Sequence, residues 1–204
     1  DTLLKSYPND ENLKRKKAII DADLGEMILV DKEIARLEKI ESKEELRKEL
    51  DKLPQKLKEH PKVCLFRNLN FIKETSSGRD LVYYCSYTDK VWNPEVAETE
   101  GVGGSEEAVI NLSKELVKHG WNVTVYNNCG REKTYDGVHY KQFWQWNYRD
   151  KQDVTILWRH PKPTDYEINS EKVFIDLHDV IPAGEFTKER LQKIDKIFVK
   201  TNAH

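Results

Sequence analysis

The sequence predicts an α/β fold: a Rossmann-like, doubly wound parallel sheet preceded by a small α-helical segment. Three neighbouring stretches support this prediction. Residues 80–86 form an apolar run of strand length, residues 105–120 carry apolar side chains at helical spacing, and residues 121–126 alternate like a second strand. A strand, a crossover helix and a second strand form a parallel βαβ unit, which we expect to be right-handed.

The composition limits the classes of protein to which the chain can belong. Its 204 residues suffice for one sizeable domain, or for a domain with a small appendage. The net charge of -2 and the pI near 6.4 give no general attraction to nucleic acid or to an anionic membrane. No apolar run approaches the roughly 20 residues of a transmembrane segment. The three cysteines lack metal-ligand spacing, which favours reduced thiols and a cytoplasmic location.

Residues 1–60 differ from the rest of the chain, because they mix charges of both signs with apolar residues at three- and four-residue steps. Ser42 and Glu45 form the capping-box pattern of a helix that closes near Pro54. We expect a charged α-helical hairpin or small bundle here, followed by a connector over residues 61–79. These helices either contact another protein or brace the next domain, and the mixed surface charge favours bracing.

After the βαβ unit, strand-like and helix-like stretches keep alternating, as expected of one domain over residues 80–204. We expect further strands at residues 138–140, 153–158, 172–177 and 196–201, and a short helix over residues 186–194. Ligands of parallel sheets gather beyond the carboxyl ends of the strands. That edge should collect three segments that lie far apart in the sequence: the glycine turn at 101–105, Arg159, and His178 with Asp179.

The turn Gly101-Val-Gly-Gly-Ser105 stands directly before the central helix. Its bare backbone N–H groups at the positive end of a helix suit a phosphate, although a merely flexible turn has the same pattern. The preceding loop is too long for a nicotinamide-binding turn, and no Gly-Lys-Ser/Thr sequence of a P-loop follows. Glu106 and Glu107 suit the start of a helix but would compete with a bound phosphate.

His178 and Arg159 each follow a predicted strand and have two interpretations. His178 is either a hydrogen-bonded residue at a strand end or a neutral imidazole that meets a polar ligand, with Asp179 orienting it. Arg159 is either an anion clamp or a surface arginine. The acid pair Asp21 and Asp23 lies within a helical pattern, and we expect no metal site. No Ser/His/Asp nucleophile arrangement is visible.

Aromatic residues are concentrated at residues 143–148, and Trp92 lies in the loop after the first predicted strand. Aromatic faces stack on sugars or bases, but large aromatic side chains more often serve in packing. Both interpretations stay open at this point.

A family resemblance appears when the segments are taken in order. They are Trp92-Asn-Pro94, the glycine turn and helix at 101–110, His119-Gly-Trp-Asn-Val-Thr-Val-Tyr126, residues 153–159, Ile175-Asp-Leu-His-Asp179 and residues 195–201. This succession resembles the N-terminal domain of GT-B-fold glycosyltransferases, most closely the large retaining family four (glycosyltransferase group 1 type). It covers about residues 80–204 and leaves out the helical segment.

The resemblance implies transfer of a sugar from a nucleotide-diphosphate sugar to an acceptor, which can be a glycan, a lipid or a protein. Such transfer needs no metal and no tightly bound cofactor, and it usually retains the anomeric configuration. Three residues match the part of the family that meets the donor diphosphate: Gly103, Gly104 and Ser105. His178 matches the catalytic histidine that faces the donor sugar. Four residues are candidate acceptor or donor contacts: Trp92, Glu106, Arg159 and Asp179.

The chain departs from that family because the second Rossmann-like domain, which binds most of the nucleotide, has no counterpart in it. We therefore expect this chain to be the acceptor-side part of an enzyme, to bind the donor weakly at best, and to be inactive alone. One alternative is a non-catalytic α/β binding or scaffold module without nucleotide dependence. Another is a different nucleotide-binding enzyme, such as a methyltransferase.

Overall fold

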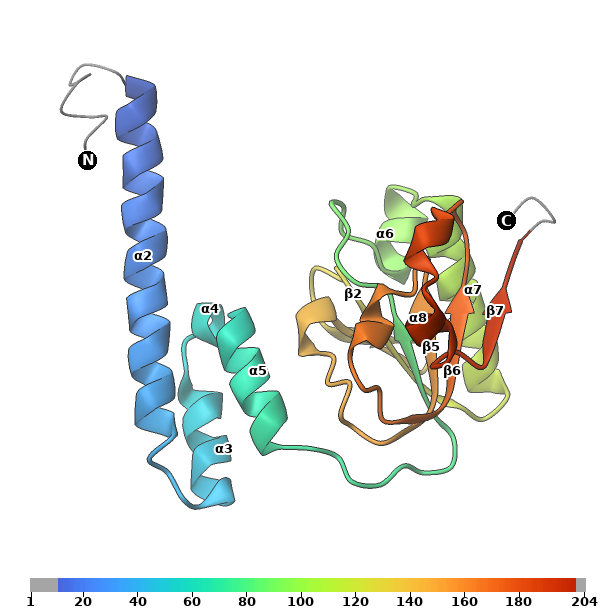
Figure 1. Ribbon diagram of the computed structural model, residues 1–204, viewed down its shortest axis with the longest axis horizontal. Coiled ribbons are helices and arrows are strands. Elements are labelled where there is room, and N and C mark those ends of the chain that lie inside the picture. Colours follow the sequence, from blue (N-terminus) through green and yellow to red (C-terminus); the bar gives the residue numbers. More distant parts are fainter. Residues whose placement is uncertain (1–10, 201–204) are drawn as a thin grey trace. The chain divides into compact units, whose positions relative to one another are not determined.

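The computed structural model describes residues 11–200. The chain divides into two compact units, and the boundary between them in the sequence falls between Asn70 and Phe71 (Figure 1). The first unit contains helices α2 (Glu11–Leu37), α3 (Lys43–Lys52), α4 (Gln55–Lys58) and α5 (Pro61–Asn70). The second unit contains the sheet. No helix in the described part of the chain is both long and apolar enough to cross a membrane.

Helix α5 corrects the prediction of a connector over residues 61–79. Residues 61–70 belong to the helical unit, and only the stretch after Asn70 is extended. Pro61 occupies the first helical position, where its fixed φ and missing N–H are tolerated. Val63 and Cys64 are then buried on one side of the helix, which ties it to the core of the unit.

The N-cap half of the predicted capping box is confirmed, because the Ser42 hydroxyl accepts a hydrogen bond from the backbone N–H of Glu45 at 3.3 Å. The core of the helical unit is formed by eight buried residues: Val30, Leu37, Leu46, Leu50, Leu53, Leu57, Val63 and Cys64. The apolar pattern of α2 is buried only from Val30 onwards. Before that point Ile20 is 64% exposed.

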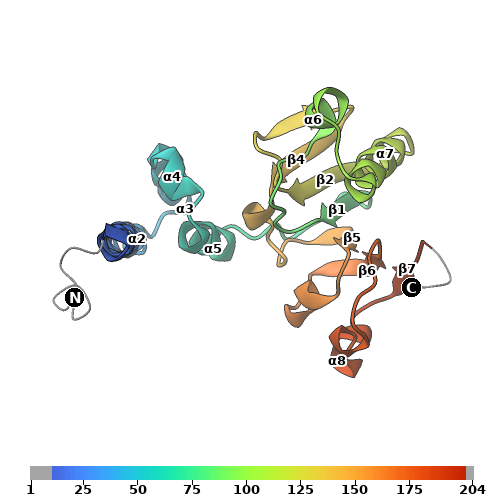
Figure 2. The ribbon, with the colours of Figure 1, turned by 90° about the horizontal axis from the view of Figure 1, so that it is seen from above.

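The second unit is built on a seven-stranded sheet with the order β3-β4-β2-β1-β5-β6-β7 (Figure 2). Its strands are β1 (Asp80–Tyr84), β2 (Asn122–Asn127), β3 (Lys133–Tyr135), β4 (Val138–Gln142), β5 (Gln152–Trp158), β6 (Ser170–Asp176) and β7 (Lys196–Phe198). All neighbouring pairs are parallel except β3 with β4. The prediction of an α/β fold with a mostly parallel, Rossmann-like sheet is confirmed.

The predicted βαβ unit is present, since β1 and β2 pair in parallel and α7 (Gly104–Lys118) connects them. The loop before α7 contains a helix that the sequence analysis did not predict, α6 (Pro94–Thr99). The side chain of Asn93 caps α6 by accepting from the N–H of Val96 at 2.9 Å. The helix predicted over residues 186–194 is shorter, with only α8 (Lys188–Leu191) helical.

The two faces of the sheet form separate cores, because side chains along each strand alternate between them. On one face, α7 packs over Tyr83, Val125 and Ile156. On the other, Val82 and Ile175 pack with side chains from loops, among them Trp146, Ile181 and Phe186. These loops adjoin the short turns η1 (Phe143–Gln145), η2 (Lys162–Asp165) and η3 (Ala183–Glu185) and helix α8. Figure 2 shows α7 and α8 on opposite faces.

Strand β1 lies at the centre of the sheet, with β2 on one side and β5 on the other. The chain leaves β1 toward α7 and leaves β5 toward η2, which lie on opposite faces. The connections therefore diverge beyond the carboxyl ends of β1 and β5. Such a switch point is where open α/β sheets bind their ligands.

Candidate functional site

A hollow of about 460 Å³ lies beyond the carboxyl end of β1, on the face covered by α7. Its walls are the loop after β1, the glycine turn before α7 and the residue after β5. The lining residues are Tyr87, Thr88, Asp89, Lys90, Val91, Trp92, Gly101, Val102, Gly103, Glu106 and Arg159. Four of the residues singled out in the sequence are therefore in one place: Trp92, Gly103, Glu106 and Arg159.

The start of α7 forms one wall of the hollow. Gly103 is the N-cap residue, has extended backbone angles and provides no side-chain cap. The first backbone N–H groups of a helix have no partner within the helix and carry a partial positive charge. Gly101 has a φ of +76°, which favours glycine because a Cβ atom is strained there. The turn thus has the geometry of a helix-terminal anion site.

In this structure the anion at that helix start belongs to the chain itself. Glu106 folds back so that its Oε2 accepts a hydrogen bond from Ser105 Oγ at 2.8 Å. The carboxylate lies so near Gly103 that a Cβ atom at position 103 would overlap it. Glycine is needed there for this close approach. A phosphate at the start of α7 would have to displace the Glu106 carboxylate.

Arg159 connects three parts of the site. Its Nη2 donates to Ser105 Oγ at 2.7 Å and lies 3.5 Å from Glu106 Oε1, in the first turn of α7. Its Nε lies 2.9 Å from Asp179 Oδ2, beyond the end of β6. The guanidinium also lies 3.7 Å from the centre of the Trp158 ring, a cation–π distance. Arg159 is thus a half-buried cation held between two carboxylates.

Two non-glycine residues that follow the central strands have left-handed backbone angles. Ser86 follows β1 with a φ of +53°, and Arg159 follows β5 with a φ of +72°. A left-handed conformation costs about 1–2 kcal/mol for a residue with a Cβ atom. Residues under such strain concentrate at functional sites. Both lie at the switch point, which favours this edge as the site.

The ring of His178 does not line the hollow. Its Nε2 lies 3.0 Å from Asp176 Oδ2, and its side chain is only 8% exposed. Tyr83 donates its hydroxyl to the same carboxylate, and Lys200 Nζ lies 2.5 Å from Asp176 Oδ1. The geometry matches a hydrogen-bonded histidine at a strand end, and the catalytic role of His178 stays a prediction.

The buried carboxylate of Asp176 organises this network. Burial alone would raise its pKa, but the ammonium of Lys200, the hydroxyl of Tyr83 and the neighbouring His178 together lower it. Burial and the charge of Asp176 raise the pKa of Tyr83, so its phenol stays protonated and donates. Asp176 is therefore ionised and holds the His178 ring in a fixed orientation.

Trp92 belongs mainly to the core beneath the hollow, because it is only 2% exposed. Its ring centre lies 5.8 Å from that of Trp158. Little of its face is available for stacking on a ligand. The sequence analysis did not single out Lys90 or Tyr87, which line the hollow. Their position a few residues beyond the first predicted strand was the available signal.

Two further features concern the chemistry of the site. Within residues 11–200, no three or more His, Cys, Asp or Glu side chains are grouped so that they could hold a metal ion. The three cysteines are buried thiols that form no disulfide. The groups that the site offers a ligand are therefore backbone N–H groups, one guanidinium, one lysine and two carboxylates.

Comparisons with known proteins do not assign the chain to a family. No protein-family model matches it, and neither a curated protein nor a solved structure matches it. The function is therefore inferred from the geometry of this site and from the sequence resemblance.

Proposed function

We propose that the chain is the acceptor-side N-terminal part of a glycosyltransferase that uses a nucleotide-diphosphate sugar. The acceptor is a glycan, a lipid or a protein, and transfer is metal-independent and retaining. One observation carries the proposal: the glycine-rich start of α7 and the guanidinium of Arg159 converge on one hollow at the switch point of a parallel sheet. A half-buried cation beside a bare helix N-terminus suits a diphosphate group.

The proposed chemistry needs a stabilised leaving diphosphate. That developing negative charge would be stabilised by the backbone N–H groups of Gly104 and Ser105 and by the guanidinium of Arg159. Such preset dipoles act without reorganisation during the reaction. Arg159 now contacts Ser105 and lies near Glu106. Binding of the donor would exchange the carboxylate of Glu106 for a phosphate, with Gly103 leaving room for either.

His178 would face the donor sugar in this proposal. With Asp176 ionised, the ring's Nε2–H donates to that carboxylate, which leaves Nδ1 for the donor sugar. Once the donor reaches the ring, Nδ1 of this fixed imidazole could form a hydrogen bond with a sugar hydroxyl. The donor sugar and the nucleobase are left open.

A non-catalytic binding or scaffold module is the second candidate. It is favoured by the neutralisation of Arg159, whose side chain lies between the carboxylates of Glu106 and Asp179. A site whose cation and helix start are already satisfied needs no nucleotide. This module predicts no nucleotide binding, even after the carboxylate of Glu106 is removed. A cytoplasmic location stays a prediction for either function.

Isothermal titration calorimetry with UDP-glucose, UDP-N-acetylglucosamine, GDP-mannose and ADP-glucose tests the proposal. We expect weak, saturable binding of one donor without turnover by this chain, and at least about tenfold weaker binding by Arg159→Ala. Arg79→Ala is the matched control, because Arg79 lies at the amino end of β1 and donates to the carbonyl of His119. Absence of binding to the chain and to Glu106→Gln would contradict the transferase and favour the module.

A further inference from the structure

A second hollow lies at the same edge of the sheet but on the opposite face. Its volume is about 380 Å³, within the ~300–1,000 Å³ of small-molecule sites. It is lined by Tyr84, Ser86, Phe143, Trp144, Trp146, Tyr148, His160, Lys162, Pro163, Asp165 and Tyr166. Six of these residues are aromatic, and they include most of the aromatic patch at residues 143–148.

The aromatic rings support one another, so the walls of the hollow are preformed. Tyr84 and Trp146 stack with ring centres 4.0 Å apart, and Tyr148 and Tyr166 stack at 4.7 Å. Trp146 is buried, whereas Tyr166 is 55% exposed. The inner members of the pairs thus anchor the walls, and Tyr166 offers an accessible ring at the rim.

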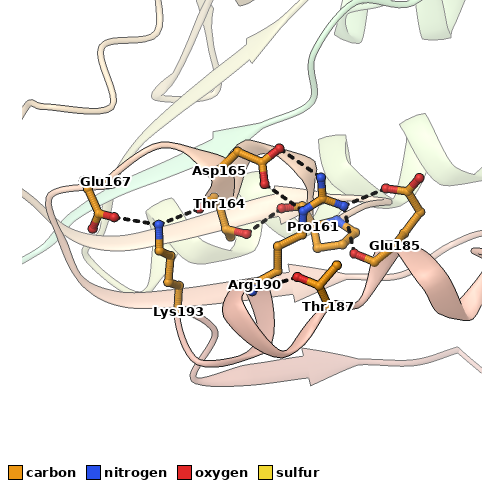
Figure 3. Close-up of polar contacts among 8 residues, drawn as sticks. All are labelled: Pro161, Thr164, Asp165, Glu167, Glu185, Thr187, Arg190 and Lys193. Atoms are coloured by element: carbon orange, nitrogen blue, oxygen red, sulfur yellow. Dashed lines mark hydrogen bonds and ion pairs between the residues drawn. The ribbon is translucent and has the colours of Figure 1, made fainter.

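The polar rim is held by a clamp of ion pairs (Figure 3). Arg190 on α8 donates from Nε and Nη2 to the two carboxylate oxygens of Asp165 at 2.7 and 2.9 Å. Its Nη1 donates to Glu185, both to the backbone oxygen at 2.9 Å and to Oε2 at 2.8 Å. Lys193 donates to the carbonyl of Thr164 at 3.0 Å. The C-terminal end of η2 is therefore held through Thr164 and Asp165.

The polar groups of the rim can form hydrogen bonds with the hydroxyl groups of a ligand. The guanidinium of Arg190 lowers the pKa of Asp165, which is therefore ionised, and its carboxylate has lone pairs left to accept from a hydroxyl. Burial lowers the pKa of His160, so its imidazole is neutral at pH 7 and can both donate and accept. Lys162 adds a donor.

We propose that this second hollow binds the ring of a neutral saccharide. The face of an aromatic ring is negative, and it attracts the C–H hydrogens of a sugar ring, which the adjacent oxygens make positive. The carboxylate of Asp165 and the imidazole of His160 then meet the hydroxyl groups at the ring's edge. A nucleobase would also stack, but it offers fewer hydroxyl groups to Asp165 and His160 than a saccharide ring does.

The saccharide would lie next to the first hollow. Ser86 lines the second hollow and its neighbour Tyr87 lines the first. Tyr87 also meets Phe143 edge to face, with ring centres 5.6 Å apart. Saccharide binding does not depend on the transferase proposal. Where both proposals hold, the saccharide is the acceptor.

Titration of the full 204-residue chain with neutral tetrasaccharides tests the inference. The probes are maltotetraose, chitotetraose and mannotetraose, with adenosine as the competing ring. Tryptophan fluorescence reports binding because Trp144 and Trp146 line the hollow, and calorimetry confirms it. We expect saturable binding of at least one tetrasaccharide, and weaker binding of adenosine. No nucleotide sugar is present, so this result is independent of transferase activity.

Substitutions at Tyr166 make the test specific, because this ring is more than half exposed and its loss should not unfold the chain. We expect Tyr166→Ala to weaken saccharide binding by about twofold to tenfold, since one stacking face is worth roughly 0.5–1.5 kcal/mol. Tyr166→Phe keeps the face and should bind like the wild type. Phe198→Ala is the control, an aromatic 42% exposed on β7 outside the lining. Absence of binding to all three saccharides, or unchanged binding by Tyr166→Ala, overturns the inference.

Discussion

The carboxylate of Glu106 lies over the backbone of Gly103, so near that a side-chain carbon at position 103 would overlap it. The helix start of α7, which is a natural place for an anion, is therefore occupied by an anion of the chain. The same carboxylate accepts from Ser105 and lies 3.5 Å from Arg159 Nη2. Ligand binding at this turn is a competition with Glu106.

Removing that competing charge should open the site. We expect Glu106→Gln to strengthen binding of UDP or GDP by about twofold to tenfold, because a negative charge at a helix start is worth about 0.3–1 kcal/mol, more when partly buried. The measurement is calorimetric titration of wild type and variant at low salt. Glu107→Gln is the matched control, since Glu107 occupies the next position of the same helix turn but is exposed. Equal gains in both variants would mean a general charge effect.

The elements that the sequence predicts well are those with a strong period of their own. The βαβ unit and the buried strands have apolar patterns that tertiary contacts do not reverse. Helix α5 differs, because Val63 and its apolar neighbours fit a strand and a helix equally and only Pro61 indicates a helix start. Helix α6 has the usable signal Asn93-Pro94, an N-cap followed by proline at the first helical position.

For the site, the topology was predictable and the side-chain geometry was not. Parallel strands bring Gly103, Arg159 and Asp179 to one edge of the sheet, independently of the conformations of their side chains. Whether Arg159 is free or paired depends on contacts between segments far apart in sequence, which no local pattern encodes. The second hollow shows the same limit, since residues 143–148 predict aromatic density but not that Tyr84 and Tyr166 complete its walls.

Arg190 should be irreplaceable by lysine. Its planar guanidinium binds Asp165 through two nitrogens and Glu185 through a third (Figure 3). A lysine ammonium cannot reproduce that fork. We expect Arg190→Lys to lower the melting temperature and to increase amide hydrogen exchange over residues 161–167, measured by mass spectrometry. Saccharide binding should weaken too, because Asp165 loses its fixed position.

Lys172 provides the comparison for that experiment. Its exposed Nζ pairs with Asp195 Oδ1 at a distance of 2.6 Å, and neither residue belongs to η2. Lys172→Arg should leave exchange over residues 161–167 unchanged. Exchange that stays slow in Arg190→Lys would show that η2 is held without the Arg190 clamp, by its prolines, its backbone hydrogen bonds and Lys193.

The N-cap of α3 should contribute measurably to the helical unit. Ser42→Ala removes the hydroxyl that accepts from the N–H of Glu45, and loss of such a cap costs about 1 kcal/mol. We expect faster hydrogen exchange in the first turn of α3, while the sheet is unaffected. Ser42→Asp, which can accept the same hydrogen bond, should keep the wild-type exchange rate. Equal exchange in the alanine variant would show that burial of Leu46 and Leu50 alone fixes this helix start.

Asp80 anchors the amino end of β1, opposite the proposed site. Its carboxylate accepts from Lys73 Nζ at 2.5 Å, from the N–H of Ser77 at 2.9 Å and from Asn122 Nδ2 at 3.0 Å. Burial would raise its pKa, but Lys73, Ser77 and Asn122 together hold it well below the ordinary value of about 3.9. The ionised form is therefore bound more tightly in the folded state than in the unfolded state.

This shift fixes the sign of the pH dependence. A carboxylate with a lowered folded pKa stabilises the fold above its unfolded pKa, and the contribution disappears as the pH falls toward the folded pKa. We expect Asp80→Asn to lose about 1–3 kcal/mol at pH 7, because hydrogen bonds to a charged group are lost, and progressively less below pH ~4. Urea denaturation followed by tryptophan fluorescence reports the sheet unit alone, since all five tryptophans lie beyond Asn70. The exposed Asp89→Asn should change little at either pH, and a loss by Asp80→Asn that is the same at pH 7 and pH 3 would show that packing, not charge, makes Asp80 important.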